Sequence, residues 1–183
     1  ATGNKVNFYS SADLKIWAFE SSFGEGIGAH GGVWECPDLF QLPVEGTSIS
    51  KWVLIVSINP GGPNGGSATQ YFVGDFDGKN FTPVNTNTQW IDYGTDNYAG
   101  VTYSNIASSD GRRIMIGWMS NWIYAQQVPT TTWRSTTTIP KSLSLIATGP
   151  GSYLLKSWPV DEINNYKVNT LDTTISSPAK SVQ

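Results

Sequence analysis

Residues 31–40, GGVWECPDLF, place one carboxyl group at the mouth of an alternating, β-type run. Glu35 lies between the indole of Trp34 and the thiol of Cys36, and Pro37 fixes the backbone directly after them. Partial removal from water favours the neutral form of a carboxyl group. Glu35 is therefore a candidate general acid, holding a proton near neutral pH for a leaving group. The alternative is an ordinary strand glutamate that faces solvent.

On both sides of this stretch, short alternating runs are cut by Gly, Pro, Asn and Asp, and no segment keeps a 3.6-residue apolar period. The sequence therefore predicts an all-β chain. Strands are expected at residues 6–9, 16–20, 51–58, 71–76, 80–84, 90–93, 100–103, 112–119, 135–139, 142–146 and 153–158. They suffice for about two four-stranded propeller blades plus the end of a preceding one.

A weak internal repeat also indicates blades. Residues 13–17, DLKIW, and 77–81, DGKNF, share the order acidic, any, lysine, any, aromatic, each at a turn into an expected outermost strand. A hairpin that recurs at this separation is typical of propellers, although two copies can also arise by chance. Asp75 and Asp77 flank the second hairpin, so we expect a turn there rather than a catalytic carboxylate pair.

Composition points to a neutral ligand. The 183 residues allow about one domain with a real core, and the net charge of -3 provides no basic patch for nucleic acid or an acidic membrane. Eight tryptophans favour sugar binding, because sugar rings stack on indoles, although most of the eight will pack in the core. Arg112 and Arg113 are expected to be a solvated charge pair.

The single cysteine excludes an internal disulfide and a cysteine-built zinc site. His30 is the only imidazole and lies in a glycine-rich loop, so we expect no bound metal. No signal peptide or membrane span is visible, and the chain opens at Ala1, which leaves room for a targeting segment upstream. Asn80 begins an Asn-Phe-Thr sequon, which predicts glycosylation and weakly supports secretion.

The run WECPD at 34–38 resembles the acid/base motif of the glycoside hydrolase family that contains invertases, exo-inulinases, levanases and fructosyltransferases. Other segments follow in that family's order, namely 59–62 (NPGG), 70–78 (QYFVGDFDG), 96–99 (DNYA), 117–122 (GWMSNW), 129–130 (PT) and 133–135 (WRS). The resemblance covers about residues 5–160 and is closest to fungal secreted members.

The resemblance implies a five-bladed β-propeller followed by a β-sandwich. Residues 1–160 would be part of the catalytic propeller, and residues 161–183, polar and rich in Ser, Thr and Asn, would be a linker toward the sandwich. The implied activity is cofactor-free release of terminal β-fructosyl residues from sucrose or fructans, with retention, by a secreted or cell-wall protein. The oligomeric state is left open.

By the same resemblance Glu35 is the acid/base catalyst and Trp122 an aromatic wall of the fructose pocket. Asp96 and Trp34 are further candidates for substrate contact, and Asp96 equally fits a bracing role on its strand. Cys36 either tunes the neighbouring carboxyl group or fills space as a small buried hydrophobe.

Two nearby positions are less defined. Trp118 shares the run of Trp122 and fits either the pocket or the core. Asn97 replaces the phenylalanine that the family usually carries after its aspartate.

The family's nucleophile is an aspartate in a motif of the type Trp-Met-Asn-Asp-Pro-Asn-Gly, and a further acidic residue lies in an Arg-Asp-Pro motif. No Asp-Pro dipeptide occurs in residues 1–183. The chain is therefore expected to be a partial propeller that is inactive alone. A fructosyltransferase, a non-catalytic carbohydrate-binding domain and a purely structural β domain remain as alternatives.

Overall fold

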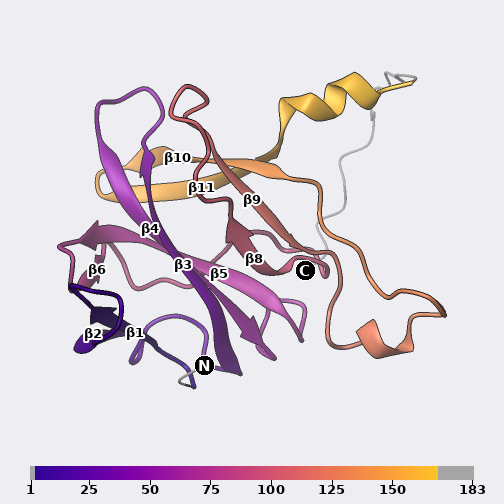
Figure 1. Cartoon of the computed structure of the whole chain (residues 1–183), viewed down its shortest axis with the longest axis horizontal. Coiled ribbons are helices and arrows are strands. Elements are labelled where there is room, and N and C mark those ends of the chain that lie inside the picture. Colours follow the sequence, from indigo (N-terminus) through magenta and orange to yellow (C-terminus); the bar gives the residue numbers. More distant parts are fainter. Residues whose placement is uncertain (1–2, 169–183) are drawn as a thin grey trace.

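A computed structural model describes residues 3–168 and is built almost wholly of β-strands (Figure 1). A two-stranded sheet comprises β1 (Val6–Ser10) and β2 (Ala18–Phe23). The central sheet comprises β3 (Val33–Pro43), β4 (Ser50–Asn59), β5 (Ala68–Phe76) and β6 (Phe81–Pro83), with β7 (Gln89–Trp90) on β5. The last sheet comprises β8 (Tyr98–Thr102), β9 (Arg113–Trp118), β10 (Lys141–Gly149) and β11 (Ser152–Pro159). These antiparallel meanders confirm an all-β chain that forms part of a propeller.

Strand β4 explains how the sheets stack. Its apolar run is buried on both faces, because alternate side chains enter two different cores. Val53 and Ile55 belong to the core between the central and last sheets, whereas Leu54 and Val56 belong to the core shared with β1 and β2. Full burial of each such side chain is worth roughly 1.5–3 kcal/mol, so β4 anchors the stack.

Polar contacts also join the central and last sheets. The Tyr71 hydroxyl accepts hydrogen bonds from Gln89 Nε2 at 3.1 Å and from the Leu155 backbone N–H at 3.2 Å. Glu45, just beyond β3, accepts from Ser144 Oγ at 2.6 Å and pairs with Lys156 Nζ at 3.2 Å. The two sheets therefore pack as one body through apolar and polar contacts.

The predicted repeat forms the same turn twice. Asp13 Oδ1 accepts the backbone N–H groups of residues 15 and 16, both at 2.9 Å, and Asp77 Oδ1 accepts those of residues 79 and 80 at 2.8 and 2.7 Å. Leu14 and Gly78 occupy matching positions with φ of 60° and 96°. Lys79 also pairs with Glu20 of β2 at 2.8 Å. The expected turn role of Asp77 is confirmed, and the ion pair joins the second turn to β2.

Residues 135–139 were expected to form a strand and do not. They belong to the connection between β9 and β10, which includes the 3-10 turn η1 (Ala125–Gln127). They contact the end of β9 through an isolated bridge from Trp118 to Thr137 and through hydrogen bonds between Gly117 and Thr138. The rest of that edge of β9 pairs with β10, from Lys141 onward, so little of the ladder is left for residues 135–139.

The arginine pair is also not merely solvated. Arg112 bonds both Asp110, at 2.6 Å, and Glu162, at 2.7 Å. Arg113 places its guanidinium 5.1 Å from the centre of the Phe40 ring. Arg112 therefore holds the 3-10 turn η2 (Asp161–Tyr166) through Glu162, and Arg113 packs on the core.

The predicted linker begins with η2, and its residues 169–183 lie outside the described part of the chain. Among residues 3–168, no helix is long and apolar enough to cross a membrane.

Candidate active site

Glu35 lies at a β-bulge. The pairing of β3 with β4 shifts register between Glu35 and Asp38, and Cys36 has a φ of 48° within the bulge. A bulge adds one residue to a strand and redirects the neighbouring side chain, and bulges are common beside active sites. Glu35 is half-buried and borders a cavity of about 380 Å³ between β1 and the start of β3. The carboxyl group is thus both held by the sheet and accessible.

Trp34 is packed in the core next to Glu35. Only 2% of it is exposed, its Nε1 donates to the Ala29 carbonyl at 2.7 Å, and its ring packs on Phe72 at 5.8 Å. His30 stacks on the indole with ring centres 5.4 Å apart. Trp34 also lines the cavity that Glu35 borders, so its contact with substrate stays a prediction beside its packing role.

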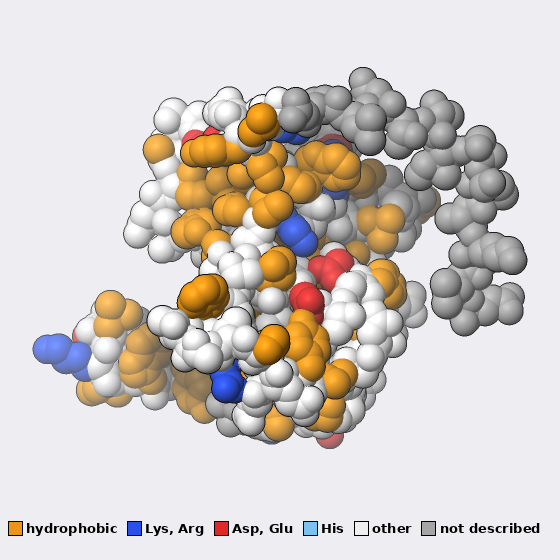
Figure 2. Space-filling model, turned by 90° about the vertical axis from the view of Figure 1, so that its right-hand side faces the viewer, with side chains coloured by type: hydrophobic (Ala, Val, Ile, Leu, Met, Phe, Trp, Pro, Cys, Tyr) orange, Lys and Arg blue, Asp and Glu red, His pale blue; other side chains and the backbone are white. Residues whose placement is uncertain are grey.

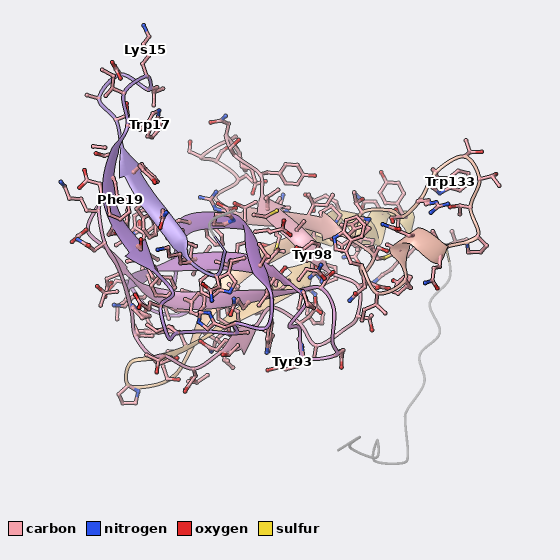
Figure 3. The ribbon with its side chains drawn as sticks, turned by 90° about the horizontal axis from the view of Figure 1, so that it is seen from below. Lys15, Trp17, Phe19, Tyr93, Tyr98 and Trp133 are labelled. Carbon is pink, nitrogen blue, oxygen red and sulfur yellow. The ribbon has the colours of Figure 1, made fainter. Side chains whose placement is uncertain are left out.

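Tyr98 is the partner of Glu35. The Tyr98 hydroxyl, from β8 at the inner edge of the last sheet, donates a hydrogen bond to Glu35 Oε2. Figure 3 shows Tyr98 near the middle of the molecule, between the β1–β2 hairpin and the loop that carries Trp133. Burial, followed by the bond to Glu35, raises the pKa of Tyr98, so its hydroxyl stays protonated as a donor.

An open aromatic row extends from this tyrosine. The rings of Tyr98 and Trp118 have centres 6.3 Å apart, and those of Trp118 and Trp122 lie 5.0 Å apart. Trp118 is half-buried, while 48% of Trp122 is exposed. Figure 2 shows acidic side chains near the middle of one face of the molecule, with hydrophobic side chains around them. A partly open indole such as that of Trp122 can stack on a sugar ring.

Asp96 is exposed and accepts a hydrogen bond from the hydroxyl of Tyr124. This bond is the main cause of the raised pKa of Tyr124. Asn97, next in the chain, is buried, and its Nδ2 donates to Asp92 Oδ2 at 2.5 Å. Asp96 therefore faces the loop of Trp122, whereas Asn97 points into the protein.

Cys36 is exposed, in contrast to the alternative of a small buried hydrophobe. Partial desolvation, and then the charge of Glu35, raise the pKa of its thiol. The thiol of Cys36, next to the carboxyl group of Glu35, is therefore uncharged at neutral pH.

Most other acidic side chains of the motifs have protein partners. Asp38 accepts from the Thr102 backbone N–H at 2.8 Å and from its hydroxyl at 2.6 Å, and Asp75 pairs with Lys51 at 2.9 Å. Within residues 3–168, no three His, Cys, Asp or Glu side chains are grouped to hold a metal ion.

Sequence reasoning missed Tyr98 and Tyr124. Both lie in or beside segments that were singled out, but only contacts between distant segments show which carboxylate each hydroxyl meets. Asn80 of the sequon is exposed on its turn.

Comparison with known proteins shows the family of the chain. Residues 1–159 match the model of the glycosyl hydrolases family 32 N-terminal domain. A levanase of Bacillus subtilis is 49% identical over 170 residues, which cover 91% of this chain and 25% of the levanase. The resemblance therefore extends to a bacterial protein, beyond the fungal members expected.

Solved structures of related enzymes also resemble this chain. An exo-inulinase from Aspergillus awamori superposes with a TM-score of 0.78 at 41% identity, covering 86% of this chain and 31% of the inulinase. A fructofuranosidase from Schwanniomyces occidentalis, complexed with fructose, gives a TM-score of 0.76 at 39% identity, covering 87% and 31%. The chain thus spans between a quarter and a third of the length of these relatives. The chain belongs to the glycosyl hydrolase family 32 N-terminal domain family.

Proposed function

We propose that this chain carries the acid/base half of a retaining β-fructofuranosidase active site, with Glu35 as the catalyst. The observation that carries the proposal is the bulge at Glu35, where the carboxyl group meets the Tyr98 hydroxyl and borders a cavity. The substrates would be sucrose or fructans, since the relatives include a levanase, an exo-inulinase and a fructofuranosidase complexed with fructose.

The proposed reaction has two steps. Glu35 protonates the departing glycosidic oxygen while a second carboxylate, about 5 Å away, attacks the anomeric carbon. The attack leaves a covalent fructosyl-enzyme ester on the second carboxylate. Glu35 then removes a proton from a water molecule that attacks the anomeric carbon, which breaks the ester bond and releases fructose with retained configuration. Tyr98 would act as a positioning residue that orients Glu35, and no cofactor is needed.

We further propose that Trp122 stacks on the fructosyl ring and that Asp96 accepts a sugar hydroxyl. Support comes from the open indole of Trp122 and the exposed carboxylate of Asp96. Secretion and glycosylation at Asn80 are proposed from the sequon and from its exposed place on a turn. A linker role for residues 161–183 is likewise a proposal.

Glu35→Gln in the full-length protein tests the catalytic assignment. The amide keeps the shape but cannot cycle a proton, so kcat for sucrose should fall by roughly 10² to 10⁴ while KM changes little. Glu25→Gln, at an exposed loop glutamate, is the matched control and should leave both constants unchanged. Activity of the Glu35 variant within about threefold of the parent would contradict the proposal.

A further inference from the structure

The side chain of Asn121 is fully buried, and its hydrogen-bonding capacity is fully used. Its Oδ1 accepts the backbone N–H groups of Ser67 at 3.2 Å and Ile123 at 3.0 Å. Its Nδ2 donates to the carbonyls of Ser67 at 3.2 Å and Thr95 at 2.9 Å. Buried amides that are fully paired in this way define one arrangement of the segments that they join.

The joined segments are three loops around the aromatic row. Ser67 ends the loop after β4, Thr95 directly precedes Asp96, and Ile123 directly follows Trp122. Ser67 adds its own hydroxyl, which accepts the Trp122 backbone N–H at 3.1 Å and donates to Asn59 Oδ1 at 3.0 Å. Trp122 is therefore held from both sides of its own backbone.

The backbone of Asn121 organises the next turn as well. Its carbonyl accepts the N–H groups of Tyr124 at 3.1 Å and Ala125 at 2.9 Å, which starts η1. Tyr124 then reaches the carboxylate of Asp96. Asn121 thus joins the segments of Asp96 and Tyr124 in two ways. Its side-chain amide donates a hydrogen bond to Thr95, beside Asp96, and its backbone carbonyl accepts the N–H of Tyr124 at the turn.

Gly66 shows how closely the backbone approaches this amide. A Cβ at Gly66 would lie 2.3 Å from Asn121 Oδ1 and 2.5 Å from a side-chain carbon of Ile123, and its φ is +65°. Both the space and the backbone conformation require glycine. The close contact of the loop after β4 with Asn121 therefore depends on glycine at position 66.

We infer that Asn121 is a positioning residue that fixes Trp122 and Asp96 relative to each other in the sugar-binding wall. This inference rests on the proposed function. The side-chain hydrogen bonds of Asn121 go to Ser67, Thr95 and Ile123 and not to Glu35 or Tyr98, which are held by the bulge and by β8. Its removal should therefore weaken substrate capture more than the chemical step.

The test compares Asn121→Ala and Asn121→Asp with Tyr71→Phe in the full-length protein, using sucrose and inulin as substrates. Asn121→Asp puts a carboxylate oxygen against the carbonyls of Ser67 or Thr95, so repulsion replaces attraction. Both Asn121 variants should raise KM about tenfold or more and change kcat by less than about threefold. Tyr71→Phe loses a buried, hydrogen-bonded hydroxyl away from the wall, so it should lower the melting temperature with unchanged KM.

A double variant asks whether Asn121 acts through Trp122. If it does, adding Asn121→Ala to Trp122→Ala should raise KM by less than about threefold beyond Trp122→Ala alone. Ser67→Ala removes the acceptor of the Trp122 backbone N–H and the donor to Asn59. It should also raise KM, and it replaces Asn121→Ala in the test if that variant does not fold.

Lower melting temperature with unchanged KM, as in the Tyr71 control, would overturn the inference, as would fully additive effects of Asn121 and Trp122. A different measurement tests the proposed function itself. Hydrolysis that survives Glu35→Gln would contradict that function, whereas the role of Asn121 is judged on KM and on the change in tryptophan fluorescence when fructose is added.

Discussion

At the scale of single residues, the site depends on hydrogen bonds that select one side-chain orientation. Glu35 is aimed by the bulge and held by Tyr98, and Trp34 supports it from the core through Ala29 and Phe72. Because Trp34 is buried, the exposed stacking surface belongs to Trp122. Removal of the Tyr98 hydroxyl should therefore affect the action of Glu35, whereas removal of the Trp122 indole should affect sugar binding.

Tyr98→Phe removes the donor to Glu35 and little else. Without this hydrogen bond the carboxyl group is no longer held in one orientation, so kcat for sucrose should fall by roughly tenfold while KM changes little. Initial rates over a range of sucrose concentrations in the full-length protein measure both constants. Tyr93→Phe, at an exposed tyrosine, is the control, and an unchanged kcat in the Tyr98 variant would refute the positioning role.

Trp122→Ala should weaken sugar capture by roughly 1 to 3 kcal/mol, through lost stacking and burial. The fold should change little, because about half of the residue is already exposed. Sucrose kinetics and melting temperature are measured together, with Trp158→Ala, at a more exposed tryptophan on β11, as the control. Unchanged kinetics with a large loss of melting temperature would assign Trp122 to packing.

At the scale of elements, the turn at Asp13 connects β1 to β2 and the turn at Asp77 connects β5 to β6. In each turn the aspartate accepts two backbone N–H groups, and the second turn is joined to β2 through Lys79 and Glu20. The bonds to these backbone groups lower the pKa values of Asp13 and Asp77. The turns therefore carry a pH dependence with a defined sign.

A lowered pKa means that the folded state holds the carboxylate more firmly than the unfolded state does. The contribution of Asp77 to stability is thus present above its ordinary value of 3.8 and is lost as the pH falls below it. Asp77→Asn should lower the melting temperature at neutral pH and reduce the loss of stability below pH 3.8. Melting curves across pH measure both effects.

Asp75→Asn is the comparison for that experiment. Asp75 is exposed, and both of its carboxylate oxygens bond the flexible side chain of Lys51. Exposed ion pairs contribute little, so this variant should change the melting temperature less than Asp77→Asn. The reverse order would contradict the importance of the turn.

At the scale of the whole molecule, residues 3–168 contain one proposed acid/base carboxyl group, Glu35, and no evident second catalytic carboxylate. Asp38 and Asp75 are bonded to Thr102 and Lys51, and Asp92 and Asp96 are bonded to Asn97 and Tyr124. Retaining hydrolysis needs two carboxyl groups at about 5 Å. Hydrolysis by residues 1–183 alone would therefore require one of these aspartates to leave its partner.

Residues 1–183, expressed alone, should release no fructose from sucrose or inulin. They should also self-associate, because β1 pairs only with β2 among the described strands and leaves one edge unpaired. Fructose release and size-exclusion chromatography test both statements. Clear activity from a monomer would mean that one of the bonded aspartates is a nucleophile, and the assignment of roles would then be wrong.

Much of the fold could be predicted from local pattern. Alternation and the turn residues identified most of the strands, but residues 135–139 form none and residues 90–93 overlap β7 only at Trp90. The DLKIW and DGKNF repeat identified two equivalent turns. The run on β4 was found as a strand, but its burial on two faces depends on sheets that pack from both sides. The motif around Glu35 identified the candidate acid.

Sequence alone determined the all-β class, the turn chemistry and the candidate carboxyl group, because alternation and turn preference act between residues close in the chain. Only the tertiary structure decided that Tyr98 meets Glu35, across 63 positions, and that Asn121 joins Ser67 across 54. It also decided that Trp34 is buried and Trp122 open, although both are tryptophans beside motif residues. The physical reason is that periodicity tells which face of a strand a side chain occupies, whereas its partner depends on which strand packs against that face.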